Sequence, residues 1–286
     1  MRRHRASLYR RCGIPAAHRI ITLVVLLQAT PLFAQFEFPA MSGSSAAMGG
    51  ISVAINDPQS AFSSIAGLAN LPSSNILLSV KQNLMSKGLT WAALATSSPL
   101  AFGGYSVSLL YFGDADYNEE MVTAAYALPL GETLSLGAAI HYLHSSTSDP
   151  YYDPYHQLTF SLAMRYAPAE KLTMTFRAYN PLAVVTDDLQ GVHTPAIFTL
   201  GASYLINKEL LIAAEVEKNL FYEATVRLGL QYLFLENYFL RAGISTTPML
   251  YSFGLGAKWE HLGADLAFQF STPLGTAPLL SVYYTF

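Results

Sequence analysis

The sequence predicts an all-β fold, a transmembrane β-barrel of fourteen antiparallel strands, and three observations support this prediction. From about residue 75 onward, apolar side chains alternate with small or polar ones. Hydrophobic residues make up 52% of the chain and charged residues only 12%, where about 25% charged is usual in soluble domains. Beyond residue 35 no apolar run is long enough for a membrane helix, so a closed barrel is the remaining way to cross lipid with every backbone group satisfied.

The first 35 residues carry the features of a secretory signal peptide. Six arginines surround or precede a short apolar run, Ile20–Leu27, and Ala34 offers a small residue for cleavage. The chain has 16 Lys and Arg residues, and removal of these six leaves 10 in the mature protein. All 19 Asp and Glu residues lie beyond the signal, so the mature net charge is 10 − 19 = −9. An acidic chain lacks the basic footprint that nucleic-acid binding needs. The single cysteine, Cys12, leaves with the signal, which excludes a disulfide from the remainder.

Fourteen amphipathic segments follow the signal and the residues next to it. Most have the length that a tilted membrane strand needs, and an even number is usual for bacterial barrels. One face of each segment suits lipid and the other suits a polar or small-residue interior. The predicted strands lie near residues 75–83, 88–97, 103–112, 121–128, 133–143, 156–166, 172–179, 195–205, 210–218, 222–233, 238–246, 249–259, 262–271 and 279–286.

The lengths of the predicted connections alternate along the chain. Connections after even-numbered strands are short, whereas 113–120, 144–155 and 180–194 follow odd-numbered strands and are long. Bacterial barrels have short periplasmic turns and long outer loops, so we expect an outer-membrane protein of a Gram-negative cell with both termini periplasmic. A secreted β-sandwich is the alternative, but its outward face would be charged, and here neither face is.

Residues 36–74 do not alternate and are rich in Gly, Ser and Ala. About forty residues with small side chains ahead of a barrel predict a plug segment folded into the lumen. A flexible periplasmic extension is the alternative. The expected organisation is therefore a signal peptide at 1–35, a plug segment at 36–74 and the barrel at 75–286.

A motif in the plug segment resembles the opening of the PorV/PorQ family, which belongs to the wider FadL-like group of fourteen-stranded barrels. The family pattern has a Gly-Gly pair, an alternating stretch that ends in Asn-Asp, and then an aromatic residue and Asn-Pro-Ala-Gly-Leu. This chain has Ser64-Ile65 where the family has Asn-Pro. The residues that carry the motif are Gly49, Gly50, Asn56, Asp57, Pro58, Gly67 and Leu68.

The resemblance implies one of two functions. PorV-like proteins are Bacteroidota outer-membrane components of type IX secretion, so the first expectation is a non-enzymatic subunit or accessory of an outer-membrane protein complex, linked to type IX protein secretion. FadL-like proteins pass hydrophobic small molecules along a path that a plug controls, so a channel is the alternative. The expected partners are outer-membrane lipid and lipopolysaccharide, the barrel assembly machinery, and other outer-membrane or secretion-system proteins, with no nucleic acid.

Charged residues on the predicted strands fall on the face that points into the lumen. Opposite signs in a closed interior predict a paired network that holds the plug, and an ion pathway is the alternative. The residues are Arg165, Arg177, Glu215, Glu217, Arg227, Arg241, Lys258 and Asp265, with Lys81 on the first strand.

Two groups of aromatic residues are candidate contact sites. Tyr284 and Phe286 form the outward-facing end of the last strand, which resembles the C-terminal assembly signal of bacterial outer-membrane barrels. Tyr151, Tyr152 and Tyr155 lie in a proline-bounded outer loop, and tyrosine-rich loops are typical of partner recognition. Tyrosine at the membrane boundary explains the same residues equally well.

The sequence gives no sign of catalysis, a cofactor or a metal centre. No Ser, His and carboxylate arrangement has a readable spacing, so we expect no enzyme. Asp114 and Asp116 begin like a calcium loop, but the sixth position is Glu119 rather than Gly, so a solvated acidic loop is expected. His141 and His144 are three apart on a strand, which places them on opposite faces and not at one metal.

Overall fold

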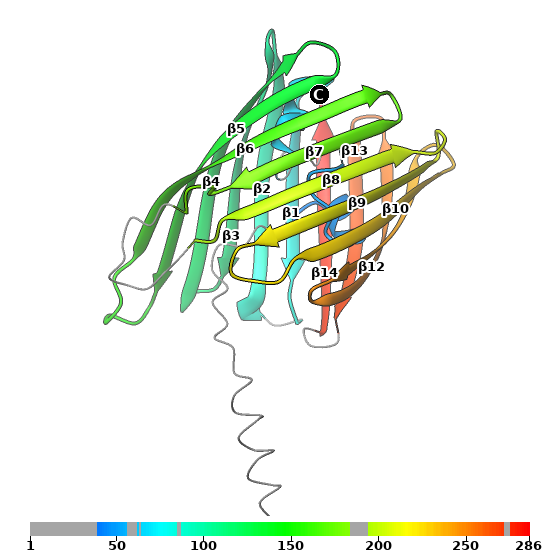
Figure 1. Cartoon of the computed structure of the whole chain (residues 1–286). Helices are drawn as coiled ribbons and strands as arrows, with labels where there is room; N and C mark the ends of the chain where they lie inside the picture. The colour runs from blue at the N-terminus through cyan, green and yellow to red at the C-terminus, as the bar shows by residue number, and fades with distance from the viewer. Residues whose placement is uncertain (1–38, 56–61, 63, 85–86, 184–193, 272–274) are drawn as a thin grey trace, which may run out of the picture. The chain divides into compact units, whose positions relative to one another are not determined.

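The computed structural model describes residues 39–55, 62, 64–84, 87–183, 194–271 and 275–286, and these form a closed β-barrel (Figure 1). Its fourteen strands pair in sequence order, each antiparallel to the next, and β1 pairs with β14 to close the ring. The strands are β1 (Asn75–Gln82), β2 (Thr90–Leu100), β3 (Gly103–Gly113), β4 (Tyr117–Leu130), β5 (Leu134–Thr147), β6 (Tyr155–Ala169), β7 (Leu172–Tyr179), β8 (Ile197–Leu205), β9 (Leu210–Asn219), β10 (Thr225–Phe234), β11 (Tyr238–Thr246), β12 (Met249–Trp259), β13 (Leu262–Ser271) and β14 (Gly275–Thr285).

The predicted fold class is confirmed, with all fourteen strands at the expected places. Two loop lengths were wrong, because β4 and β5 run further than expected. Tyr117 pairs with Thr147 at the end of that hairpin, so only residues 114–116 join β3 to β4 and residues 148–154 join β5 to β6. The signal peptide expected at 1–35 lies outside the described residues, and so do Asn56, Asp57 and Pro58 of the motif.

Alternation along the strands sorts the side chains into an apolar outer face and a mixed inner face. On β5, for example, Leu136, Ile140 and Tyr142 are exposed on the outside, and the residues between them are buried. Tyrosines follow the outer face near the strand ends, including Tyr126, Tyr166, Tyr204 and Tyr232. This is the pattern of a barrel whose outer face contacts lipid and whose aromatic residues lie at the interfaces.

The two ends of the barrel are distinguished by where the chain enters and leaves the sheet. We call the end at which β1 begins and β14 finishes the terminal rim, and the other end the opposite rim. At the terminal rim Asn75 pairs with Thr285, and the Phe286 N–H donates to the carbonyl of Ser74 over 2.9 Å. The last residue is therefore fixed to the wall beside the first strand.

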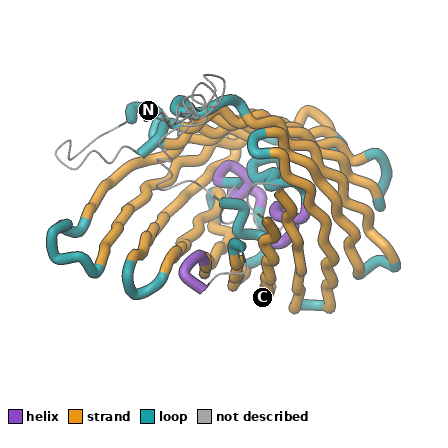
Figure 2. The backbone as a smooth tube through the Cα atoms, turned by 90° about the horizontal axis from the view of Figure 1, so that it is seen from below, coloured by secondary structure: helices purple, strands orange, loops and turns teal. Residues whose placement is uncertain are grey.

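The described part of the plug segment lies within the ring of strands (Figure 2). It contains two short helical pieces, the α-helix α2 (Gly43–Ala47) and the 3-10 helix η2 (Ile65–Asn70). A further 3-10 turn, η3 (Lys87–Leu89), joins β1 to β2. Helix α2 contacts β11 to β14, whereas η2 contacts β2 to β6, so the plug segment touches both sides of the barrel.

Among the described residues, no helix is long and apolar enough to span a membrane.

Candidate functional site

Helix α2 is defined by a serine cap and a glycine turn. The Ser42 hydroxyl accepts from the Ser45 N–H over 3.1 Å, which caps the first turn. Gly49 and Gly50 then take φ values of 78° and 85°, which end the helix in a conformation that glycine adopts without cost. A Cβ on Gly49 would lie 2.7 Å from the Ile244 carbonyl oxygen of β11. The Gly-Gly pair of the motif therefore lets the plug backbone lie directly against the wall.

Helix α2 is held by hydrogen bonds from inward-facing polar side chains of β12, β13 and β14. The Gly49 N–H donates to the Ser252 hydroxyl over 2.7 Å, and that hydroxyl donates to the Ala47 carbonyl over 2.9 Å. The Gln269 amide donates to the Ala46 carbonyl over 3.1 Å, and the Gly43 N–H donates to the Ser281 hydroxyl over 3.0 Å. These side chains satisfy backbone groups that a five-residue helix cannot pair for itself.

The strongest contact between plug and wall is made by the buried carboxylate of Glu215 on β9. Its Oε2 accepts from the N–H groups of Ser52 and Val53, each over 2.9 Å. Its Oε1 accepts from Arg227 Nη1 over 2.9 Å. Hydrogen bonds to an ionised acceptor are about twice as strong as neutral ones. One carboxylate therefore joins the plug backbone to the charge network of the wall.

Two sets of lumen charges pair among themselves. In the first, Arg227 also binds Glu217 over 2.7 Å, and Arg177 lies 3.9 Å from the other oxygen of Glu217. In the second, Arg241 forms an ion pair with Asp265. The Arg241 Nε also donates to Gln231 over 2.6 Å, and the guanidinium stacks 4.8 Å from the centre of the Phe239 ring.

Two lumen charges stand apart from these networks at the terminal rim. Arg165 donates to the Thr173 hydroxyl over 3.4 Å, and Lys258 is half-buried. Neither forms an ion pair within the described part of the chain. Lys81 of β1 also lies on the inner face and forms no ion pair among the described residues, so six of the nine candidate lumen charges pair with one another.

The inner wall bears glycine where the plug approaches most closely. A Cβ on Gly229 of β10 would lie 2.8 Å from Met48 Cβ, and one on Gly254 of β12 would lie 2.6 Å from Ala47 Cβ. On the other side of the barrel, a Cβ on Gly137 of β5 would lie 3.0 Å from the Ala66 nitrogen. Real Cβ contacts are longer than these. Glycines on the inner face thus mark the path of the plug along the wall.

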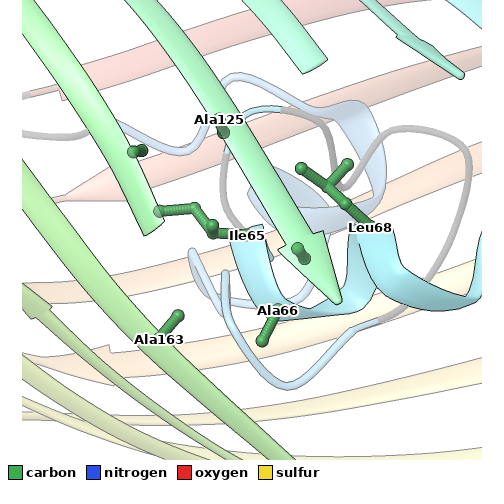
Figure 3. Close-up of a cluster of buried hydrophobic side chains, with 7 residues drawn as sticks. Ile65, Ala66, Leu68, Ala125 and Ala163 are labelled. Atoms are coloured by element: carbon green, nitrogen blue, oxygen red, sulfur yellow. The ribbon is translucent and has the colours of Figure 1, made fainter. Parts of the chain in front are cut away.

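The plug contacts the wall at two places, which we call the α2 seat (residues 43–53) and the η2 seat (Ile65–Asn70). The η2 seat is apolar (Figure 3). Ile65, Ala66 and Leu68 pack against small residues of β4, β5 and β6, among them Ala125 and Ala163. Leu68 is fully buried and Gly67 is enclosed within the same turn. At the end of this helix the Asn70 side-chain amide donates to the Ser135 hydroxyl of β5 over 3.1 Å.

Between the η2 seat and the opposite rim, the inner wall of β2 to β6 carries an apolar patch, which we call the apolar mouth. Its wall residues are Trp91, Ala93, Leu110, Phe112, Met121, Leu143 and Tyr155. The Trp91 and Phe112 rings are 4.4 Å apart and tilted by 32°. Met41 and Phe62 of the plug segment pack onto the same patch. An inward apolar surface of this kind is suited to an apolar guest, not to an ion.

A polar band separates the apolar mouth from the η2 seat. His141 is buried at its centre, with Nδ1 2.8 Å from the Thr123 hydroxyl and Nε2 2.8 Å from the Ser161 hydroxyl. Its ring meets the edge of Tyr179 at 5.2 Å. The inner wall therefore changes from apolar to polar and back to apolar along its length.

The aromatic candidates divide into exposed and buried residues. Tyr284 and Phe286 face outward at the terminal rim, with their rings 5.1 Å apart. Tyr151 and Tyr152 are exposed in the β5–β6 loop. Tyr155 was wrongly assigned to that loop: it begins β6, points inward, and donates to Gln157 over 3.0 Å. Because Tyr155 is buried on the inner face of β6, it is not available to a partner protein.

The outer face of the barrel carries a further hollow. A cavity of about 770 Å³ lies on the outer face of β8 to β12, above the small side chains of Ala202, Ala214 and Ala242. No group of three or more His, Cys, Asp and Glu side chains in the described ranges is placed to hold a metal ion.

The apolar mouth and the short helix α2 were not anticipated from the sequence. A signal for the mouth was present, because Leu109-Leu110-Tyr111-Phe112 is apolar on both faces and so breaks the alternation. A signal for α2 was present in Ser42, a favoured N-cap residue that precedes Ser44, Ser45, Ala46 and Ala47.

Comparison with known proteins shows the fold. No protein-family model matches the sequence, and no curated protein matches it. The structure is similar to that of the toluene transporter TbuX from Ralstonia pickettii, with a TM-score of 0.69 and 10% identity over 88% of this chain and 100% of that one. It is also similar to a Pseudomonas aeruginosa FadL homologue, with a TM-score of 0.67 and 12% identity over 88% of this chain and 99% of that one. A third similar structure is the CymD monoaromatic hydrocarbon channel, with a TM-score of 0.64 and 14% identity over 88% of this chain and 98% of that one.

The fold is that of the FadL-type outer-membrane barrels with fourteen strands. None of these comparisons points to the PorV/PorQ family in particular.

Proposed function

We propose that this protein is an outer-membrane channel for hydrophobic small molecules, with the plug segment closing its path. The observation that carries the proposal is the apolar mouth. Its wall residues face the lumen, where a channel for hydrated solutes would place polar groups. In this structure Met41 and Phe62 cover that surface, so plug side chains occupy the place that we assign to an apolar guest.

The names of the structural neighbours support the same proposal. They are described as a toluene transporter and a monoaromatic hydrocarbon channel. Substrates of that chemical class would fit a patch built from Trp91, Phe112 and Leu143, because burying apolar area is worth about 25 cal/mol per Å². Transport requires binding and movement rather than bond chemistry, so the proposed function is not enzymatic.

The plug provides the means of control. It is fixed on one side by Glu215 and the hydroxyls of Ser252 and Ser281, and on the other by apolar contacts of η2. A guest that displaces Phe62 and Met41 would loosen the plug near its apolar seat first. We assign the lumen charges to plug retention rather than to ion conduction, because six of the nine pair with one another.

A second function, as a subunit of an outer-membrane or type IX secretion complex, is favoured by one observation. Tyr151 and Tyr152 are 92% and 68% exposed beyond the strands, where they are available to a partner protein. Mild solubilisation followed by co-purification tests it. Stoichiometric recovery of large subunits that is lost with Tyr151→Ala and Tyr152→Ala would favour this function over the channel.

Tryptophan fluorescence provides a direct test of the channel proposal. The chain has two tryptophans, Trp91 in the apolar mouth and Trp259 on the outer face. Trp259→Phe leaves Trp91 as the single reporter, and toluene is the probe. We expect saturable quenching that Leu143→Asn weakens and the conservative Leu143→Met retains. Non-saturable quenching that is equal in all variants would contradict the proposal.

A further inference from the structure

Two histidines lie side by side on the outer face near the opposite rim, away from the plug and the apolar mouth. His144 of β5 and His156 of β6 are direct partners in the antiparallel register. Their rings stack with centroids 4.6 Å apart and planes at 23°. This pair was not predicted from the sequence, because the hairpin brings together residues that are twelve apart in the chain.

Three ligating atoms converge at this pair. His144 Nδ1 is 3.2 Å from His156 Nδ1, and the Tyr142 hydroxyl oxygen is 2.7 Å from the same His156 nitrogen. A neutral imidazole nitrogen that accepts has a single lone pair in the ring plane. His156 Nδ1 therefore either accepts from its neighbours through this one lone pair or carries the proton and donates to them. A cation between the three atoms would use all their lone pairs at once.

The spacing of the two imidazole nitrogens is close to that of ligands around one metal ion, whereas the Tyr142 oxygen lies at hydrogen-bond distance from His156 and would have to move outward. Zinc binds imidazole nitrogen at about 2.0–2.1 Å, so two nitrogens in tetrahedral geometry are about 3.3 Å apart. The 3.2 Å separation of the two Nδ1 atoms is close to this value. Hydrogen-bonded strands fix the backbone on either side. The stacked rings direct their in-plane lone pairs nearly side by side, so each ring would turn about its side-chain bonds to point its Nδ1 at a shared ion.

We propose that His144 and His156, with the Tyr142 oxygen as a third ligand, form a binding site for a transition-metal ion of the Zn²⁺, Cu²⁺ or Ni²⁺ class. Imidazole donors suit these ions and not Mg²⁺ or Ca²⁺. Water completes the coordination, since the site lies on the surface. Glu120 of β4 is the register partner of His144 on the same outer face, which adds a negative charge near the cation.

A bound ion at this place would cross-link β5 and β6 at the base of their connecting loop. That loop, residues 148–154, carries the exposed Tyr151 and Tyr152. Metal occupancy would therefore order the loop at the opposite rim. The inference does not depend on what passes through the lumen.

The test is calorimetric titration of the detergent-solubilised full barrel, without a histidine tag, with Zn²⁺ and separately with Ni²⁺. We expect one ion bound per chain at pH 7.5. His144→Phe and His156→Phe keep a stacked aromatic pair but remove one ligand each. Each should weaken binding roughly tenfold or more, and Tyr142→Phe should weaken it less.

A matched control is available at the other rim. His261 is exposed beside Tyr284, with rings 5.9 Å apart, and His261→Phe should leave the titration unchanged. Heat-modifiability on gels shows whether each variant has formed the native barrel. Native wild-type protein that binds neither ion would overturn the proposal, and so would native His144→Phe and His156→Phe variants that bind as tightly as wild type.

Discussion

The two seats of the plug segment differ in their polar contacts, although apolar side chains pack against the wall in both. Under α2, the wall of β9 to β14 presents Glu215, Ser252, Gln269 and Ser281, and each binds a backbone group of the plug. Under η2, the wall of β3 to β6 presents alanines and glycines, and Ile65 and Leu68 pack against them. Hydrogen bonds to backbone groups hold the plug on the α2 side, whereas the packing of apolar side chains holds it on the η2 side.

The difference assigns separate roles to the two sides. Backbone hydrogen bonds to a buried carboxylate are directional and costly to leave unmade. Apolar packing is non-directional, so it loosens gradually and responds to an apolar competitor. We therefore expect the α2 side to remain in place while the η2 side and the adjoining apolar mouth respond to a guest.

Glu215→Ala should have the largest effect on the α2 side. It removes the acceptor of Ser52 and Val53 and takes one partner from Arg227. Breaking a buried pair costs roughly 3–5 kcal/mol, so hydrogen exchange of residues 43–53 should accelerate while residues 64–71 change little. Glu209→Ala, at an exposed turn, is the control. Equal exchange in both variants would show that the carboxylate does not retain the plug.

Leu68→Ala should loosen the η2 side by nearly as much. Removing a fully buried leucine side chain costs about 2–5 kcal/mol, and the exchange of residues 64–71 should rise while α2 remains protected. Leu200→Ala, on the outer face, serves as the control. Simultaneous loss of protection from exchange at both seats would show that the plug unfolds as one unit, and that its two sides do not loosen separately.

Gly243→Val should displace α2 by crowding rather than by lost bonds. A Cβ here would meet the backbone of Met48 and Gly49. Overpacking costs about 1–3 kcal/mol, so limited proteolysis of the plug should be faster than in wild type. Ala242→Val, the next residue and outward-facing, should be neutral. Unchanged resistance of the plug to proteolysis in Gly243→Val would indicate that the plug backbone lies further from β11 than the structure shows.

Asn70→Ala should have the smallest effect. It deletes the hydrogen bond to Ser135 over 3.1 Å, which is worth about 0.5–1.5 kcal/mol. A slight rise in exchange limited to the end of η2 is expected. A loss of protection as large as that in Leu68→Ala would imply that polar contacts dominate this seat as well.

The sequence predicted the barrel because period-two alternation is local and repeats over fourteen segments. It also placed Glu215 and Arg227 on the inner face for the same reason. It did not predict that Glu215 binds Ser52, since these residues are 163 apart and nothing local selects one partner over another. Gly229 and Gly254 could be placed on the inner face from the alternation alone. That they leave room for the plug could be recognised only from the folded structure.

The main functional expectation, a secretion-complex subunit, stays a prediction, because the comparisons with solved structures show the fold alone. The short plug motif favoured a secretion-complex subunit, whereas the structural neighbours are FadL-type barrels described as hydrocarbon channels. Three of the seven motif residues, Asn56, Asp57 and Pro58, lie outside the described residues. Of the other four, Gly49 shapes the α2 turn and Leu68 fills the η2 seat. Those roles suit any plugged barrel and do not select one function.

Uptake by intact cells tests the central claim most directly. A Gram-negative host without such a channel would express the wild-type protein, Leu143→Asn or Leu143→Met, and entry of labelled toluene would be measured. We expect faster toluene entry with wild type and Leu143→Met than with empty vector, and entry close to the vector rate with Leu143→Asn. Natively assembled wild-type protein that leaves entry at the vector rate would contradict it.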